Sequence, residues 1–90
     1  MYARLQSDAS VMDDAIRKIL SEHGRLTADI STLARDADLY EAGMTSHASV
    51  NVMLALEEEF DVEFPDEMLT RSAFESINSI SGALATLGVD

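Results

Sequence analysis

Residues 38–67 read DLYEAGMTSHASVNVMLALEEEFDVEFPDE, and no other part of the chain is so strongly patterned. The central segment, residues 47–60, contains neither Gly nor Pro and is rich in Ala, Leu, Met and Glu, which favour helices. Ser46 stands directly before it, where the N-cap residue of a helix is expected. The stretch therefore predicts a helix that begins at Ser46 and ends near Phe60.

Apolar side chains recur along this helix at spacings of three and four residues. The set that predicts the buried stripe is Met53, Leu56 and Phe60. A second pair, Val50 and Leu54, lies on a neighbouring face.

Weaker helical patterns precede this element. Residues 8–23 predict a first helix, with Asp8 or Ser10 as its cap and Gly24 as its stop. Its apolar positions are Val11, Ala15, Ile16, Ile19 and Leu20. Residues 25–45 form a long connection, and its apolar anchors should pack on the core; they are Leu26, Ile30, Leu33 and Leu39.

The C-terminal part predicts a short helix and a longer one. Pro65 suits a first helical position and opens the short third helix, with Met68 and Leu69 facing inward. The last helix begins near Ser76, and its apolar positions are Ile77, Ile80, Leu84 and Leu87. Gly82 inside this helix costs about 1 kcal/mol relative to Ala, which predicts fraying or close packing there.

Together the patterns predict an all-α fold, a bundle of three main helices plus a short third helix in a four-helix order. The length of 90 residues predicts a single domain over residues 1–90, with an ordered core over about residues 8–87. Apolar residues make up 47% of the chain, which allows one small core.

The net charge of −11 is confined to the second part of the chain. Residues 1–35 contain five acidic and five basic residues, whereas residues 36–90 contain twelve acidic residues and Arg71 as their only base. Such a charge repels nucleic acid and anionic membranes, so neither is an expected partner. The acidic surface is either a solvated face or a docking face for basic partners.

Cysteine is absent, and no stretch approaches the roughly 18 consecutive apolar residues of a membrane span. The N-terminus also lacks the apolar region of a signal peptide. We therefore expect a monomeric, soluble protein of the cytoplasm, without disulfides or a thiolate metal site.

The sequence does not indicate an enzyme, because catalysis needs convergent groups in a concave site. Ser46 and His47 are adjacent on the predicted helix and so do not face each other. Residues 36–47 superficially suggest a calcium loop, but Glu41 and His47 stand where an EF-hand needs Gly and Glu. No catalytic or metal-binding residue is assigned.

Ser46 has two interpretations from its position alone. One is a plain N-cap serine. The other is an attachment point for a phosphorylated group, because a phosphate ester there would meet exposed backbone N–H groups and the positive end of the helix.

The segment DLYEAGMTS, residues 38–46, resembles the D-L-x-x-x-G-x-D-S signature of acyl carrier proteins. Residues 52–67, VMLALEEEFDVEFPDE, are similar to the second helix of that family and its exit, and residues 74–77, FESI, to the entry of its last helix. The resemblance covers residues 8–87. It implies that Ser46 carries 4'-phosphopantetheine, attached from coenzyme A by a phosphopantetheinyl transferase. The chain would then be a non-catalytic carrier of an acyl or aminoacyl thioester.

Two positions depart from the family pattern. Thr45 replaces the usual Asp before the serine, and His47 replaces an apolar residue after it. Because the family's transferases contact these positions, we expect a generic transferase to load the chain poorly. The segments YEAGMTS and FPDEML resemble a small subgroup of stand-alone carriers. That subgroup accepts an activated amino acid from ligases resembling the catalytic core of aminoacyl-tRNA synthetases.

The predicted partner surface is the part of the central helix beyond the serine, an apolar centre rimmed with charge. Its members are Thr45, His47, Val50, Leu54, Glu57, Glu58 and Asp61. The expected partners are the transferase, an acyl- or amino acid-activating ligase and a downstream acceptor enzyme. Core packing of Val50 is the alternative for that residue. The alternative for the whole chain is an acidic helical interaction module without a prosthetic group.

Overall fold

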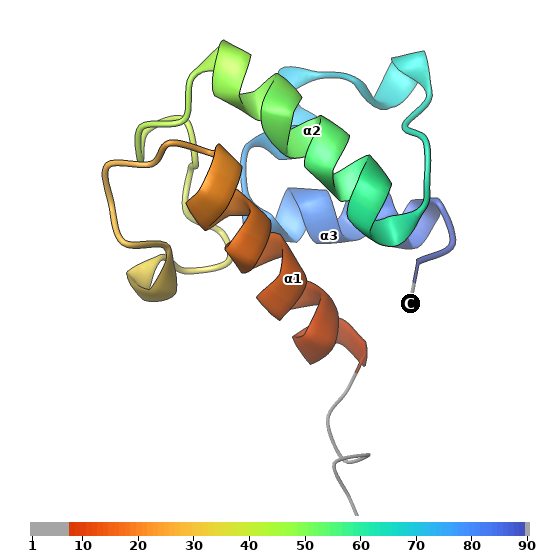
Figure 1. The fold of residues 1–90 in the computed structure, drawn as a ribbon, viewed down its shortest axis with the longest axis horizontal. Helices are drawn as coiled ribbons and strands as arrows, with labels where there is room; N and C mark the ends of the chain where they lie inside the picture. The colour runs from red at the N-terminus through yellow and green to blue at the C-terminus, as the bar shows by residue number, and fades with distance from the viewer. Residues whose placement is uncertain (1–7, 90) are drawn as a thin grey trace, which may run out of the picture.

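The computed structural model describes residues 8–89, which form three α-helices joined by loops and short 3₁₀ turns (Figure 1). The helices are α1 (Asp8–His23), α2 (Ser46–Phe60) and α3 (Ile77–Thr86). The turns are η2 (Ile30–Thr32), η3 (Asp66–Met68) and η4 (Arg71–Phe74). No strand occurs within the described residues, and the all-α prediction is confirmed.

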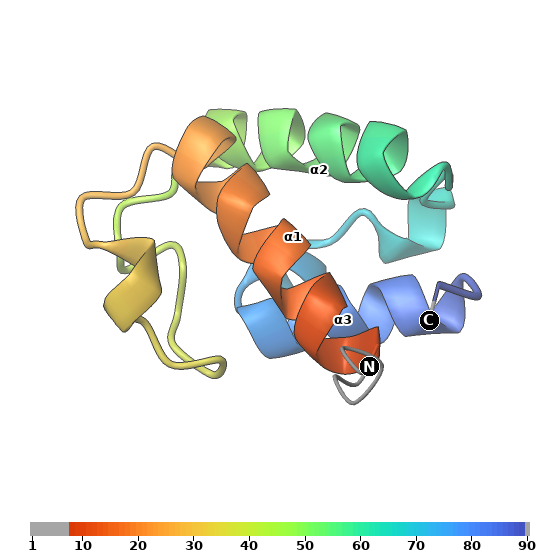
Figure 2. The same cartoon turned by 60° about the horizontal axis from the view of Figure 1, so that its bottom comes forward.

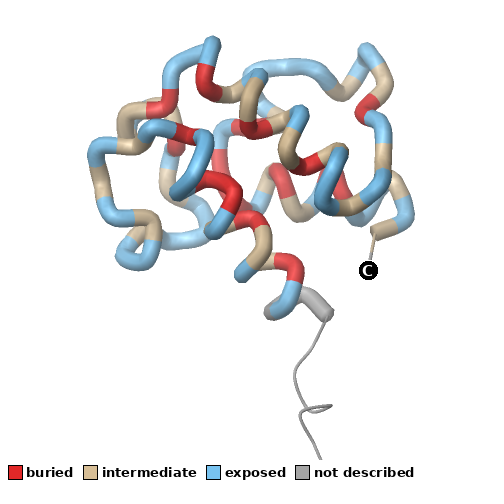
Figure 3. Tube along the Cα trace, in the orientation of Figure 1, coloured by how far each residue is buried: buried red, intermediate tan, exposed pale blue. Residues whose placement is uncertain are grey.

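α1 crosses the other two helices and packs against both of them (Figure 2). The side chains between the helices form one apolar core, which appears as the red segments in Figure 3. Fully buried members from the three helices are Ile16, Leu20, Val52, Leu56, Ile77, Ile80 and Leu84. No helix within the described residues is long and apolar enough to cross a membrane.

The buried face of α1 differs by one position from the prediction. Val11 is 57% exposed, whereas Met12 beside it is buried. Met12 lies four residues before Ile16 and eight before Leu20, so it continues their stripe, and its sulfur accepts a hydrogen bond from the Ser81 hydroxyl of α3 at 3.4 Å. Both predicted caps of α1, Asp8 and Ser10, fall inside the helix, and their side chains lie outside the described part of the structure.

The buried stripe of α2 is also shifted from the predicted one. Its fully buried residues are Ala48, Val52 and Leu56. Of the predicted stripe only Leu56 is buried, whereas Met53 and Phe60 are half-buried at its edges. The spacing of four residues places the three side chains on one face of α2.

The short third helix is present as two 3₁₀ turns and not as an α-helix. Pro65 has extended backbone angles and precedes η3 rather than opening an α-helix. Thr70 then caps η4, its hydroxyl accepting from the amide of Ala73 at 3.3 Å. Such local side-chain bonds compete with helix formation. Leu69, predicted to face inward, is 44% exposed.

The last helix agrees with its prediction. Ser76 is its N-cap, and the hydroxyl accepts a hydrogen bond from the amide of Ser79 at 3.0 Å. Gly82 is exposed, and a Cβ built on it would meet nothing within 4 Å, so close packing does not explain this glycine.

The long connection between α1 and α2 is fixed to the core as expected. Leu39 is fully buried, and its amide donates to the carbonyl of Glu75 at 2.7 Å. The guanidinium of Arg17 donates to the carbonyls of Ile30 and Leu33 at 2.7 and 3.0 Å. The other predicted anchors, Leu26, Ile30 and Leu33, are partly buried against the core.

Candidate functional site

The turn that precedes α2 has a positive φ at Gly43, a conformation that glycine adopts far more readily than other residues. Gly43 has a φ of +117°, and a Cβ there would lie 2.8 Å from the backbone nitrogen of Thr27. The next residue, Met44, is buried and its amide donates to the carbonyl of Leu39 at 3.0 Å. The end of the connection is therefore fixed where α2 begins.

Thr45, and not Ser46, is the N-cap of α2. Its hydroxyl accepts a hydrogen bond from the amide of Ala48 at 3.0 Å, and its backbone is extended, with φ −86° and ψ 166°. Ser46 is thus the first residue of the helix, which corrects the prediction that it is the cap. Thr takes the capping role at the position where the carrier signature has Asp, and either side chain is suited to it.

The hydroxyl of Ser46 is left without a structural role. Ser46 is exposed, and its Oγ takes part in no hydrogen bond among the described residues, whereas its carbonyl accepts from the Ser49 hydroxyl at 2.7 Å. The first turn of α2 contains no acidic residue. Ser46 therefore lies at the positive end of the α2 dipole. No carboxylate in the first turn of α2 would repel an anion bound there.

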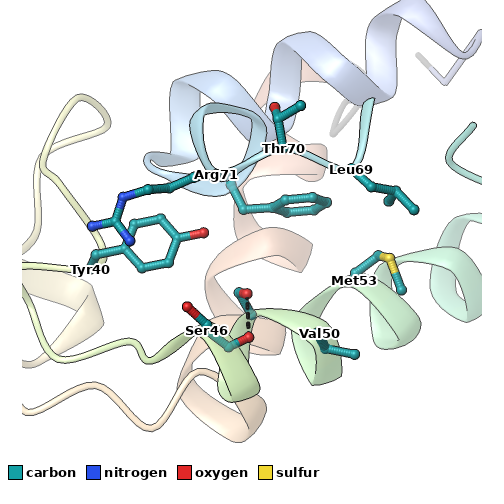
Figure 4. Close-up of a pocket in the computed structure, with 9 residues that line it drawn as sticks. Tyr40, Ser46, Val50, Met53, Leu69, Thr70 and Arg71 are labelled. Carbon is teal, nitrogen blue, oxygen red and sulfur yellow. Dashed lines mark hydrogen bonds between the residues drawn. The ribbon is translucent and has the colours of Figure 1, made fainter. Parts of the chain in front are cut away.

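Ser46 borders a groove of about 370 Å³ between α2 and the segment that carries η4. We call it the Ser46 groove; its lining includes Tyr40, Ser46, Val50, Met53, Arg71 and Phe74. Figure 4 shows Ser46, Val50 and Met53 along one wall, and Leu69, Thr70 and Arg71 along the other. The groove is mainly apolar, and its polar lining consists of hydroxyl-bearing residues and the Arg71 cation.

Tyr40 and Arg71, which are far apart in the sequence, contact each other in the lining of the groove. The guanidinium carbon of Arg71 lies 3.9 Å from the centre of the Tyr40 ring, which is the geometry of a cation–π interaction. Sequence reasoning missed both residues as parts of the site. The signal for Arg71 was present, because it is the only base in residues 36–90.

Most of the predicted partner surface is exposed on α2. Val50 is 50% and Leu54 is 53% exposed, so the alternative of core packing for Val50 is wrong. His47, Glu58 and Asp61 are exposed as well. These five residues, His47, Val50, Leu54, Glu58 and Asp61, are called the α2 face below.

Glu57 does not belong to the α2 face. It is half-buried, and its carboxylate accepts a hydrogen bond from the amide of Phe64 at 2.9 Å. Its carbonyl accepts from the amides of Asp61 and Val62, where Asp61 has a left-handed φ of 55°. Glu57 therefore closes the C-terminal end of α2, which its sequence position among three glutamates did not indicate. The hydroxyl of Thr45 is likewise used within the chain.

No group of three or more His, Cys, Asp or Glu side chains in the described residues could hold a metal ion. The two histidines do not form a pair, because His23 ends α1 and His47 lies in the first turn of α2. What the site offers is one exposed hydroxyl at a helix N-terminus, beside a groove.

Residues 14–84 match the family described as "Phosphopantetheine attachment site". The chain belongs to this family. As a member it is a carrier protein, which holds its cargo on covalently attached 4'-phosphopantetheine and is not itself catalytic. The thiol at the end of that group forms the thioester with the cargo. The resemblance inferred from the DLYEAGMTS segment is thereby confirmed.

Two curated relatives are aminoacyl carrier proteins. The carrier protein is 51% identical over 69 residues to the "Aminoacyl carrier protein" of Agrobacterium fabrum, covering 77% of this chain and 83% of the relative. It is 33% identical to "Aminoacyl carrier protein 1" of Bradyrhizobium diazoefficiens, covering 77% and 73% of the two chains.

Solved structures agree in fold. One contains an engineered Bradyrhizobium japonicum glycine:[carrier protein] ligase complexed with the carrier protein from Agrobacterium tumefaciens and ATP. Its matching chain is 47% identical, with a TM-score of 0.81 over 83% of this chain and 97% of that one. A Bradyrhizobium japonicum ligase complexed with its cognate carrier protein gives 26% identity and a TM-score of 0.65, over 88% and 96% of the two chains. The carrier-protein bundle is therefore confirmed for this chain.

Proposed function

We propose that Ser46 is the attachment point of 4'-phosphopantetheine and that the carrier protein holds an amino acid as a thioester. The observation that carries the proposal is the capping of α2 by Thr45, which leaves the Ser46 hydroxyl exposed and free of hydrogen bonds within the described residues. The oxygen of a serine that capped the helix itself would instead be engaged with a helix amide.

The residues of the site fit the attachment reaction. The Ser46 oxygen forms a bond to the phosphorus of coenzyme A that carries the pantetheine. The bond from that phosphorus to the bridging oxygen of the pyrophosphate breaks, adenosine 3',5'-bisphosphate leaves, and the hydroxyl proton passes to a base of the transferase. The exposed amides at the start of α2 stabilise the negative charge of the resulting phosphodiester.

Intact-mass measurement tests the attachment. Coenzyme A and a permissive transferase should add one phosphopantetheinyl group to the wild-type chain and none to Ser46→Ala. Ser49→Ala is the matched control, because Ser49 lies on the same helix and borders the same groove. It should be modified in full. Modification of Ser46→Ala in equal yield would exclude the assignment.

An amino acid is the proposed cargo because of the curated relatives, which are aminoacyl carrier proteins. The proposed loading partner is an amino acid:carrier protein ligase, because such ligases are bound to carrier proteins in the solved structures. We also propose a phosphopantetheinyl transferase and a downstream acceptor enzyme as partners. Incubating the holo-protein with such a ligase, ATP and a labelled amino acid should give a label that hydroxylamine releases; transfer of a fatty acyl group in its place would contradict the cargo.

The α2 face is the proposed docking surface for the ligase. Leu54→Ala should lower kcat/KM for loading roughly fivefold, which corresponds to about 1 kcal/mol of lost contact energy. Val11→Ala is the matched control, since Val11 is 57% exposed but lies on α1. It should leave kcat/KM unchanged. Equal values for both variants and the wild type would show that the ligase holds only the prosthetic arm.

Charge reversal on α2 tests the electrostatic part of docking. Glu58 and Glu59 are both exposed and adjacent, but only Glu58 belongs to the α2 face. Glu58→Lys should slow loading and flatten its dependence on salt, because charges at a docking surface mainly raise the association rate. Glu59→Lys has the same net charge and should change loading less. Equal effects would indicate a response to net charge and not to a surface.

A further inference from the structure

Arg71 is the only basic residue between positions 36 and 90, a region with twelve acidic residues. Arg17 and Arg35, in contrast, are bonded to the carbonyls of Ile30 and Leu33 and to the carboxylate of Asp13. Among the described residues, the Arg71 guanidinium takes part in no ion pair and no hydrogen bond. Arg71 therefore offers unused N–H donors within an acidic region of the chain.

The position of this guanidinium is set by Tyr40. The contact at 3.9 Å holds the guanidinium over the Tyr40 ring, and its N–H groups have no acceptor among the described residues. Tyr40 is itself held in place, because its amide donates to the Asp38 carboxylate at 2.9 Å. The cation therefore lies over Tyr40 in the lining of the Ser46 groove, which also contains the Ser46 side chain (Figure 4).

We propose that Arg71, stacked on Tyr40, binds the phosphodiester of the prosthetic group on Ser46. This inference rests on the proposed attachment at Ser46. A phosphodiester has one negative charge shared by two non-bridging oxygens, which a guanidinium can bind with two parallel N–H donors. The α2 amides would hold the phosphate from the Ser46 wall of the groove, and Arg71 would hold it from the opposite wall.

The neutral residue at position 45 supports the same arrangement. An Asp before the serine would place a carboxylate next to the phosphodiester, and the two like charges would repel each other. Thr45 caps α2 without that charge, and the first turn of α2 contains no acid. The phosphate thus meets one cation and the positive helix end within an otherwise acidic half of the chain.

Magnetic resonance of the apo- and holo-protein tests the contact directly. On conversion to the holo-form, the Nε–Hε signal of Arg71 should move and its exchange with water should slow several-fold. The corresponding signals of Arg17 and Arg35 should not change. The ³¹P resonance of the holo-protein should shift in Arg71→Gln and not in Lys18→Gln, a matched loss of charge at an exposed residue of α1.

Arg71→Lys keeps the charge but loses the planar donors, and its ³¹P resonance should fall between those of the wild type and Arg71→Gln. An Arg71 signal unchanged by conversion, or a ³¹P resonance identical in the wild type and Arg71→Gln, would overturn the inference and leave the attachment at Ser46 intact. Absence of the mass increase on the wild-type chain would instead refute the attachment, and this inference with it. A purely structural stack of Arg71 on Tyr40 predicts the same Arg71 signal in both forms.

Discussion

Two serines begin helices in this protein, and their hydroxyls are used in opposite ways. Ser76 precedes α3, is only 6% exposed, and binds the amide and the hydroxyl of Ser79. Ser46 begins α2, is exposed, and has a hydroxyl that bonds to nothing in the described residues. The difference comes from the preceding residue, because Thr45 caps α2 whereas Ser76 caps α3 itself.

The comparison separates a structural serine from one available for modification. Both positions satisfy the N-cap pattern in the sequence, and only the register of the cap distinguishes them. Because Thr45 and not Ser46 is the cap of α2, the Ser46 hydroxyl is free and the helix still has a capping hydrogen bond. The proposed modification at Ser46 therefore costs no helix capping.

Replacing each of the two serines by alanine gives the largest expected contrast between stability and modification. Ser76→Ala should lower the free energy of unfolding by about 1–2 kcal/mol and leave phosphopantetheinylation intact. Ser46→Ala should abolish phosphopantetheinylation and leave stability nearly unchanged. Urea denaturation and intact mass measure the two effects. Equal destabilisation by both substitutions would mean that Ser46 also caps its helix.

Replacing Gly82 in α3 and Gly43 before α2 by alanine should change the free energy of unfolding in opposite directions. Gly82→Ala in α3 should stabilise the protein by about 0.5–1 kcal/mol, because the site is an open helical position. Gly43→Ala before α2 should destabilise it by at least about 1 kcal/mol, because φ is +117° and the new Cβ would meet the Thr27 backbone. Thermal unfolding of both variants checks this. A gain from Gly43→Ala would show that the turn before Ser46 is not fixed.

The Thr45 cap of α2 can be removed or replaced by mutation. Thr45→Ala should cost about 1 kcal/mol of unfolding free energy in the apo-protein, because the amide of Ala48 loses its acceptor. Thr45→Asp, which introduces the residue of the carrier signature, should keep most of the stability. Denaturant titration of the two apo-variants makes the comparison. Similar losses in both would mean that the bond to Ala48 is not what stabilises the start of α2.

The sequence predicted the helices well where one face is buried and the ends carry clear signals. α3 is the best case, since Ser76 is its cap and Ile77, Ile80 and Leu84 are fully buried. It failed where two neighbouring faces are both apolar, as for Val11 and Met12, because periodicity alone does not fix which face meets the core. It failed again at the short third helix, where Thr70 bonds locally and forms a 3₁₀ turn instead.

Within the candidate site, the sequence pointed to Ser46 but not to its surroundings. Ser46 lies in a contiguous motif, so the family resemblance made it the candidate attachment point. Tyr40 and Arg71 are 31 positions apart, and their stacking depends on how the two loops meet over α2. The bond from Phe64 to Glu57 is equally invisible in a run of three glutamates. Contacts between loops depend on tertiary packing, which residue spacing does not encode.

The capped 3₁₀ turn η2 gives the weakest expected effect. The Asp29 carboxylate accepts from the amide of Ser31 at 3.0 Å and from its hydroxyl at 2.8 Å. These hydrogen bonds lower the pKa of Asp29, and the hydrogen bond from the Ser31 backbone amide is the larger cause. Because the folded-state pKa lies below the unfolded one, the stabilisation is present above the unfolded pKa and is lost as pH falls through the folded pKa.

Titration of the Asp29 carboxyl carbon by nuclear magnetic resonance checks this. The pKa should lie below the ordinary value in the wild type and rise part of the way in Ser31→Ala, which removes the hydroxyl but keeps the larger amide contribution. Asp36→Asn, at an exposed carboxylate of the same connection, controls for the loss of one charge elsewhere. It should leave the pKa of Asp29 almost unchanged, because exposed charges are screened by salt and water. A pKa that is the same in the wild type and Ser31→Ala would mean that the hydroxyl does not contribute in solution. The cap of η2 would then differ from that of α3, where the capping Ser76 is buried and its bond to the Ser79 hydroxyl is partly buried.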